Sequence, residues 1–200
     1  AMKKILVVQS SARQEGSLTR EYTAQLVRQI EAANPGSWVV TRDLGAEPIP
    51  HLDGTLLGGW MKPAEEQTEE ERAAAARSGQ LIDELLASDI VVIGSSMYNF
   101  GITSTLKSWF DHVLLAGRTF KYTENGPVGL AGDRKVYVVT ARGGRYAGTP
   151  IDFQEPYIRQ LLGFIGIQDV EFVNVEGQAL GEEEAAKGRA EADQALAAIA

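Results

Sequence analysis

Hydroxyl side chains are concentrated in residues 10–19, where an apolar strand pattern gives way to a helical one. Ser11, Ser17 and Thr19 stand in this segment. The start of a helix offers free backbone N–H groups and the positive end of its dipole, and the hydroxyls add further donors. The segment is therefore typical of a phosphate site. The alternative interpretation is that Ser17 only caps the helix.

Two arginines, Arg13 and Arg20, stand in or next to this segment and could add positive charge to it. The segment matches neither G-x-G-x-x-G nor G-x-x-x-x-G-K-[ST], the spacings of dinucleotide-binding Rossmann sites and of P-loops. The pattern therefore argues against both of those classes of site.

A second unusual segment, residues 95–102, follows another apolar run and contains Met97, Tyr98 and Phe100. Three large apolar side chains together are odd for a solvent loop at the end of a strand. A flat aromatic ligand would account for them, because backbone groups can bind the edge of a ring while apolar side chains cover its face. The alternative is that the three side chains pack in the core.

A third segment, residues 140–146, contains the pair Gly143-Gly144. Paired glycines let backbone N–H groups approach a ligand closely. Donors aimed at the pyrimidine side of a flavin would stabilise the negative charge of its reduced ring. A glycine pair alone could equally be a turn, so the hypothesis rests on the three segments together.

Composition excludes several other chemistries. The 200 residues include no cysteine, which rules out disulfides, iron–sulfur clusters, thiolate metal sites and cysteine nucleophiles. His51 and His112 match no metal spacing, so we expect no metal, and any redox chemistry must use a bound organic cofactor.

The net charge of -8 makes nucleic acid and anionic membranes poor partners. With no apolar run of membrane-spanning length and no signal-peptide pattern, we expect a cytoplasmic protein.

Strand and helix patterns alternate along the chain. We expect strands at residues 5–8, 38–40, 90–94, 136–139 and 170–175, and the first and third of these are continuous apolar runs, typical of strands covered on both faces. Segments with helical spacing follow each of them, and one begins with the capping-box pattern Thr68–Glu71. This alternation predicts one α/β domain over residues 1–200, a flavodoxin-like three-layer sandwich with a five-stranded parallel sheet in the order 2-1-3-4-5. In such a sheet, ligands bind at the carboxyl ends of strands one, three and four, where the three unusual segments lie.

The connection between the second strand and the next helix, residues 43–67, is unusually long and rich in proline and glycine. Such loops are often functional. Its apolar residues Leu56, Leu57, Trp60 and Met61 could cover a ligand or a partner subunit, or could pack on the chain's own surface.

Several motifs together resemble those of the FMN-dependent NADH azoreductases, also described as NADH:quinone oxidoreductases, of the flavodoxin-like superfamily. The motifs are Ser11 with Ser17-Leu18-Thr19, Met97-Tyr98-Asn99-Phe100, Leu106-Lys107-Ser108-Trp109-Phe110-Asp111, the segment TFKYTENGP at 119–127, Arg142-Gly143-Gly144, and Leu162-Gly163-Phe164-Ile165-Gly166-Ile167. The resemblance extends from the first strand to the last helix. This chain departs from some relatives at Ala141, where a serine is often found, and at Arg145-Tyr146, a stretch that can hold a histidine.

The resemblance implies non-covalent FMN, NADH or NADPH as the electron donor, and a homodimer with its active sites at the subunit interface. The FMN phosphate would be bound by Ser11, Ser17, Leu18 and Thr19. The ring would be lined by Met97, Tyr98, Asn99 and Phe100. The pyrimidine end of the ring would contact Ala141, Arg142, Gly143 and Gly144. Tyr122 and Phe164, with Trp60 from the partner subunit, would cover the flavin.

The mechanism that this implies is a ping-pong transfer of two electrons from the reduced nicotinamide through FMN to a quinone or azo compound. The flavin carries the chemistry, so no side chain is expected to be an indispensable acid, base or nucleophile. Asn99, Tyr122 and Tyr146 are expected to modulate the reaction. The main alternative is a flavodoxin-type electron carrier with no substrate of its own.

Overall fold

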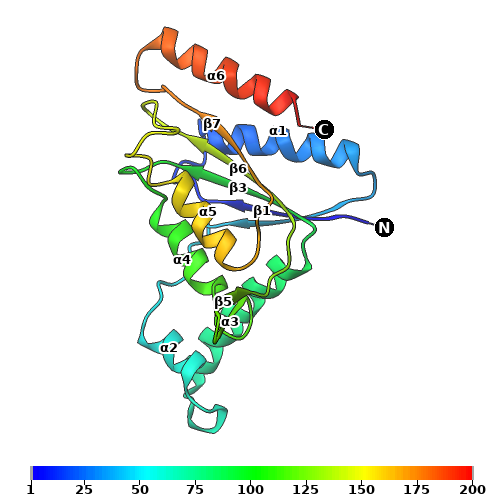
Figure 1. Cartoon of the computed structure of the whole chain (residues 1–200), viewed down its shortest axis with the longest axis vertical. Coiled ribbons are helices and arrows are strands. Elements are labelled where there is room, and N and C mark those ends of the chain that lie inside the picture. The colour runs from blue at the N-terminus through cyan, green and yellow to red at the C-terminus, as the bar shows by residue number, and fades with distance from the viewer. Residues whose placement is uncertain (1, 200) are drawn as a thin grey trace.

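A five-stranded parallel sheet forms the centre of the molecule in the computed structural model, which describes residues 2–199 (Figure 1). Its strand order is β2-β1-β3-β6-β7. The strands are β1 (Lys4–Gln9), β2 (Trp38–Asp43), β3 (Ile90–Ser96), β6 (Lys135–Ala141) and β7 (Val170–Val175). Numbered along the chain within this sheet alone, the order is the 2-1-3-4-5 that the sequence predicted, so that prediction is confirmed.

Helices cover both faces of the sheet and give the expected three layers (Figure 1). The helices α1 (Leu18–Ala33) and α6 (Glu182–Ala197) pack on one face, and α3 (Glu69–Ala87), α4 (Ser104–Val113) and α5 (Glu155–Phe164) on the other. Each face has its own apolar core. The strands supply both cores because successive side chains point to opposite faces, which explains why the central strands β1, β3 and β6 each contain a continuous apolar run.

The sequence suggested a long loop at residues 43–67, but the structure contains regular elements there. It contains α2 (Gly54–Met61) and a short 3-10 helix, η1 (Ala64–Glu66). The helix α2 packs closely on α3 because Gly58 and Gly59 carry no side chain: a Cβ on Gly58 would overlap the Glu71 carboxylate. Leu56 is buried, whereas Leu57 and Met61 are exposed.

The predicted capping box is present at the start of α3. The Thr68 hydroxyl accepts from the Glu71 N–H at 3.1 Å, and the Glu71 carboxylate accepts from the Thr68 N–H at 2.8 Å. This second hydrogen bond and an ion pair with Lys62 lower the pKa of the Glu71 carboxyl.

A small antiparallel hairpin, which the alternation pattern did not predict, lies between α4 and β6. It consists of β4 (Phe120–Thr123) and β5 (Gly126–Gly129). The hairpin packs beside the end of α5, where a Cβ on Gly129 would overlap the backbone of Gly166. The helices α4 and α5 begin at the carboxyl edge of the sheet and end at its amino edge. The hairpin follows α4 and packs beside the end of α5, so it lies at the amino edge.

No helix among residues 2–199 is long and apolar enough to cross a bilayer.

Candidate functional site

The three segments singled out in the sequence meet at the carboxyl edge of the sheet. The strand register aligns Gln9 of β1 with Gly94 of β3, and Ser96 of β3 with Ala141 of β6, so the loops that follow these strands are neighbours. Two adjoining cavities, about 210 and 750 Å³, open between them, and Tyr98 lines both. Their volumes together are those of a cofactor site.

The smaller cavity collects residues from all three loops. It is lined by Ser11, Arg13, Gly16, Ser17, Leu18, Ser96, Tyr98, Ala141, Arg142, Gly143 and Gln178. The larger cavity extends past Asn99 to the start of α4 and reaches Gly45 after β2. Eight of the predicted site residues thus line one or both of these cavities: Ser11, Ser17, Leu18, Tyr98, Asn99, Ala141, Arg142 and Gly143.

A chain of hydroxyls crosses the first loop. The Ser17 hydroxyl donates to that of Ser11 at 2.9 Å, lies 3.2 Å from the Thr19 hydroxyl, and accepts the Arg20 N–H at 3.3 Å as the cap of α1. Ser17 thus caps the helix and lines the cavity at once, so the two interpretations are compatible. The N–H groups of Leu18 and Thr19 precede the first helical bond, from the Glu21 N–H to the Ser17 carbonyl.

Thr19 itself is completely buried and does not line the cavity. Its hydroxyl lies 3.3 Å from that of Ser96, so it links the first loop to the end of β3.

Arg20 does not add free charge to the site, contrary to what its position in the sequence suggested. Its guanidinium forms a bidentate ion pair with Asp43 at 2.7 and 2.9 Å. It also donates to the carbonyls of Ser11 and Arg13 at 2.9 and 2.6 Å. The hydrogen bonds from Arg20 lower the pKa of the Asp43 carboxyl. Arg20 therefore holds the loop from behind, and Arg13 is the arginine of this pair that lines the cavity.

The second loop is a tight two-residue turn in a strained conformation. Tyr98 and Gly101 exchange both backbone hydrogen bonds, at 3.1 and 3.0 Å, and the residues between them have positive φ, 49° for Asn99 and 69° for Phe100. This is the pattern of a type I′ turn, which normally favours Asn and Gly. A phenylalanine there costs of order 1–3 kcal/mol.

The turn keeps aromatic side chains at the surface instead of in the core. Tyr98 is 44% exposed and Phe100 47%, which rules out the core-packing alternative for these two side chains. Phe100 meets Tyr146 of the third loop edge to face, with ring centroids 5.6 Å apart. Met97 is half-buried, and its backbone N–H donates a hydrogen bond of 2.9 Å to the Ala141 carbonyl, which joins the turn to β6.

The glycines of the third loop fulfil different structural needs. Gly143 lines the smaller cavity. A Cβ on Gly144 would lie 2.8 Å from the Tyr146 ring, so this glycine makes room for that ring. The Arg142 side chain is buried among Asp152, Gln154 and Glu176, three residues that the sequence patterns did not single out.

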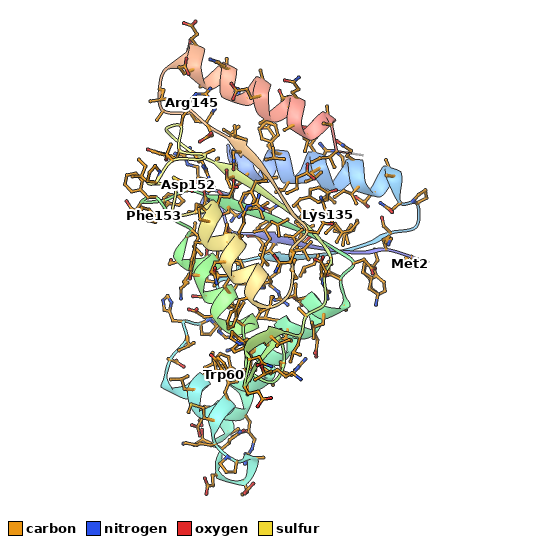
Figure 2. The ribbon with its side chains drawn as sticks, viewed as in Figure 1. Met2, Trp60, Lys135, Arg145, Asp152 and Phe153 are labelled. Carbon is orange, nitrogen blue, oxygen red and sulfur yellow. The ribbon has the colours of Figure 1, made fainter. Side chains whose placement is uncertain are left out.

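The predicted cover residues lie elsewhere in the chain. Tyr122 of β4 and Phe164 at the end of α5 flank Phe120, with centroids 5.5 and 4.6 Å from its ring. This cluster belongs to the amino edge of the sheet. Trp60 lies in α2, toward the narrow end of the molecule and away from Asp152 and Phe153 (Figure 2). One chain therefore does not bring Trp60, Tyr122 and Phe164 to the carboxyl-edge loops.

The two histidines come closer together than their sequence positions suggested. The His112 imidazole lies 2.9 Å from the Pro50 carbonyl, and burial lowers its pKa, while His51 lies 3.4 Å from Ser108. Residues 2–199 contain no group of three or more His, Cys, Asp or Glu side chains arranged to hold a metal ion.

Comparison with known proteins agrees with this fold and site. A family model described as flavodoxin-like fold matches residues 3–200, and the chain belongs to this flavodoxin-like family. It is 57% identical to an FMN-dependent NADH:quinone oxidoreductase of Azotobacter vinelandii and 52% identical to an FMN-dependent NADH:quinone oxidoreductase 2 of Pseudomonas fluorescens, with complete coverage of both partners in each case. Within the family, the chain belongs with these FMN-dependent NADH:quinone oxidoreductases.

Solved structures extend the comparison. An azoreductase from Bacillus anthracis superposes with a TM-score of 0.89 at 31% identity, covering 98% of each chain. An FMN-dependent NADH-azoreductase from the same species, in complex with FMN, superposes with a TM-score of 0.87 at 26% identity over the full length of both chains.

Proposed function

We propose that this chain is an FMN-dependent NADH:quinone oxidoreductase that also reduces azo compounds. The observation that carries the proposal is the meeting of a hydroxyl-rich helix start, an exposed aromatic turn and a glycine loop around two adjoining cavities. The relatives and the superposed azoreductases favour this function over a flavodoxin-type carrier. A cytoplasmic location, where reduced nicotinamide is available, goes with the proposal.

The donors present at the site fit FMN. The phosphate would be held by Ser11, Ser17, Leu18 and Thr19. Met97, Tyr98, Asn99 and Phe100 would line the ring. Ala141, Arg142, Gly143 and Gly144 would contact its pyrimidine end. Thr19 would contribute through its backbone N–H, since its hydroxyl is turned toward Ser17 and Ser96. When bound, FMN supplies the two-electron chemistry between reduced nicotinamide and acceptor.

The side chains of the site position and shield the reactants. The type I′ turn presents Tyr98 and Phe100 outward, where they can cover a flat ring and exclude water. None of the described residues that line the two cavities is Asp, Glu or His. The proposed mechanism relies on the flavin for its chemistry and on no indispensable acid or base, and Asn99, Tyr122 and Tyr146 tune the reaction.

We also propose that the enzyme is a homodimer in which each subunit covers the flavin of the other. The exposed Phe153, just before α5, is followed at helical spacing along α5 by three partly exposed apolar side chains, from the carboxyl edge to the amino edge: Tyr157, Leu161 and Phe164. Antiparallel pairing of this face about a two-fold axis would bring the Tyr122 and Phe164 of one subunit toward the loops of the other. Trp60 would join the same cover.

Stopped-flow absorbance tests the activity. The FMN-reconstituted protein is mixed anaerobically with NADH and then with benzoquinone. Rapid bleaching followed by rapid recovery is the expected result. Bleaching over many minutes would favour the electron carrier, and a protein that binds no FMN would refute both.

Mixed dimers test the shared site. A Ser17→Asp chain lacks a working phosphate site but keeps its cover, whereas a Tyr122→Ala chain keeps the phosphate site but has a defective cover. Co-expressed chains should regain activity above either variant alone, because one of the two sites in a mixed dimer is intact. If each cover served its own subunit, mixing would restore nothing.

A further inference from the structure

Arg142 is the most deeply buried cation of the carboxyl edge. Its side chain is 0% exposed, and its Nη1 lies 2.8 Å from Asp152 Oδ2 and 3.5 Å from Glu176 Oε2, while its Nε donates to Gln154 at 3.2 Å. A guanidinium is buried only at a large desolvation cost, which well-placed partners must offset. Such an arrangement, one residue before Gly143, calls for an explanation beyond packing.

Glu176 connects this cation to the third loop. The same oxygen that faces Arg142 also accepts the backbone N–H groups of Tyr146 at 2.6 Å and Ala147 at 3.0 Å. Glu176 stands directly after β7. The N–H groups of Gly177 and Ala179, which follow it, donate to the carbonyls of Gly144 and Gly143 in the same loop. One carboxylate therefore fastens the far half of the loop to the end of the sheet.

The other partners of Arg142 reach the remaining elements of the site. Asp152 accepts the N–H groups of Gln154 and Glu155 at the start of α5. The Gln154 amide donates to the carbonyl and the hydroxyl of Ser95, next to the aromatic turn. The network therefore ties together the ends of β3, β6 and β7 and the start of α5, and Figure 2 shows Asp152 at this end of the molecule.

Backbone bonds hold the first half of this loop, and Arg145 pairs with Glu184 and Glu191 at 3.2 and 3.1 Å, but the Tyr146 and Ala147 N–H groups have the Glu176 carboxylate as their acceptor. Gly143 and Ala147 are exposed, and a short loop of small residues opens easily unless its backbone bonds hold it. Yet Gly143 lines the smaller cavity, and Tyr146 must stay beside Phe100. The Glu176 carboxylate thus sets the position of Tyr146 and Ala147, the half of the loop that follows the cavity-lining Gly143.

We propose that Glu176, anchored by the buried Arg142, is a positioning residue for the flavin ring: it pre-forms the loop 143–147 against which the ring edge binds. This inference rests on the proposed function. It assigns the residue a part in binding the ring and none in binding the phosphate, which distinguishes it from Ser17.

Binding of FMN and of riboflavin to the apoprotein tests the role, because riboflavin lacks the phosphate. Glu176→Ala should weaken both ligands by the same factor, about tenfold or more, since two charge-assisted hydrogen bonds are lost. Glu176→Gln keeps an acceptor oxygen and should lose only about fivefold. The control is Glu171→Ala on β7, the strand that Glu176 follows; its partner Lys135 is at the surface, and this variant should bind like wild type.

Amide hydrogen exchange of the apoprotein gives a readout that does not depend on the cofactor. The amides of Tyr146 and Ala147 should exchange faster in Glu176→Ala, and to a smaller extent in Glu176→Gln, with the strand amides unchanged. Unchanged exchange together with unchanged affinity for both flavins would overturn the proposal, and Glu176→Gln decides the matter if Glu176→Ala does not fold. A loss for FMN alone would also overturn it. If the wild type binds no flavin, the proposed function fails instead. The exchange data would still test whether Glu176 holds the backbone of Tyr146 and Ala147.

Discussion

Replacement of Ser17 by aspartate tests the phosphate site without removing the helix cap. Ser17 accepts the Arg20 N–H as the cap of α1, and aspartate is as good a capping residue as serine. The variant should therefore fold with a stability close to that of wild type. Its new carboxylate, however, would stand beside the hydroxyl of Ser11, where the FMN phosphate is proposed to bind.

The expected magnitude follows from Coulomb's law. Two unit charges about 5 Å apart at an effective dielectric constant of about 20 repel by about 3 kcal/mol, and the phosphate carries more than one charge. The affinity for FMN should fall by at least about a hundredfold. Riboflavin, which has no phosphate, should bind the variant and the wild type about equally.

Flavin fluorescence quenching, titrated with apoprotein, measures both dissociation constants, and thermal unfolding provides the control for folding. Wild-type affinity for FMN in a folded Ser17→Asp variant would refute the phosphate assignment. An equal loss for FMN and riboflavin would mean that Ser17 affects the whole site instead of the phosphate alone.

Two further predictions concern stability. Gly58→Ala should lower the free energy of unfolding by about 1–3 kcal/mol, because its Cβ would overlap the Glu71 carboxylate, whereas Gly54→Ala, with open space around it, should not; urea unfolding compares the two. Asp43→Asn should be less stable than wild type at pH 7, because Arg20 lowers the pKa of the native Asp43 carboxyl below its usual 3.8. A depressed native pKa stabilises the fold above the unfolded-state pKa, so this difference should shrink as the pH falls below about 4, and a constant difference down to pH 2 would contradict the ion-pair explanation.

Much of the fold follows from local patterns. Five strand patterns separated by helical periodicity allow few arrangements other than a parallel sheet covered on both faces, because the strands that are apolar on both sides, such as β1 and β3, must be buried on both sides. The capping box at Thr68 was likewise readable, since both of its partners lie within one turn. The hairpin 120–129 and α2 were missed, because each is short and rich in glycine or proline and packs on elements distant in sequence.

The sequence by itself determined which loops form the site: parallel strands bring their carboxyl ends to one edge, so the segments after β1, β3 and β6 had to meet. Only the tertiary structure decided what their side chains do there. Arg20 pairs with Asp43, 23 residues away, so it does not add the free charge that its position in the sequence suggested. Arg142 is buried against Asp152 and Glu176, 10 and 34 residues away, which no sequence pattern indicated. A buried charge takes the partner that the packing of the fold brings within reach, and sequence spacing does not reveal that partner.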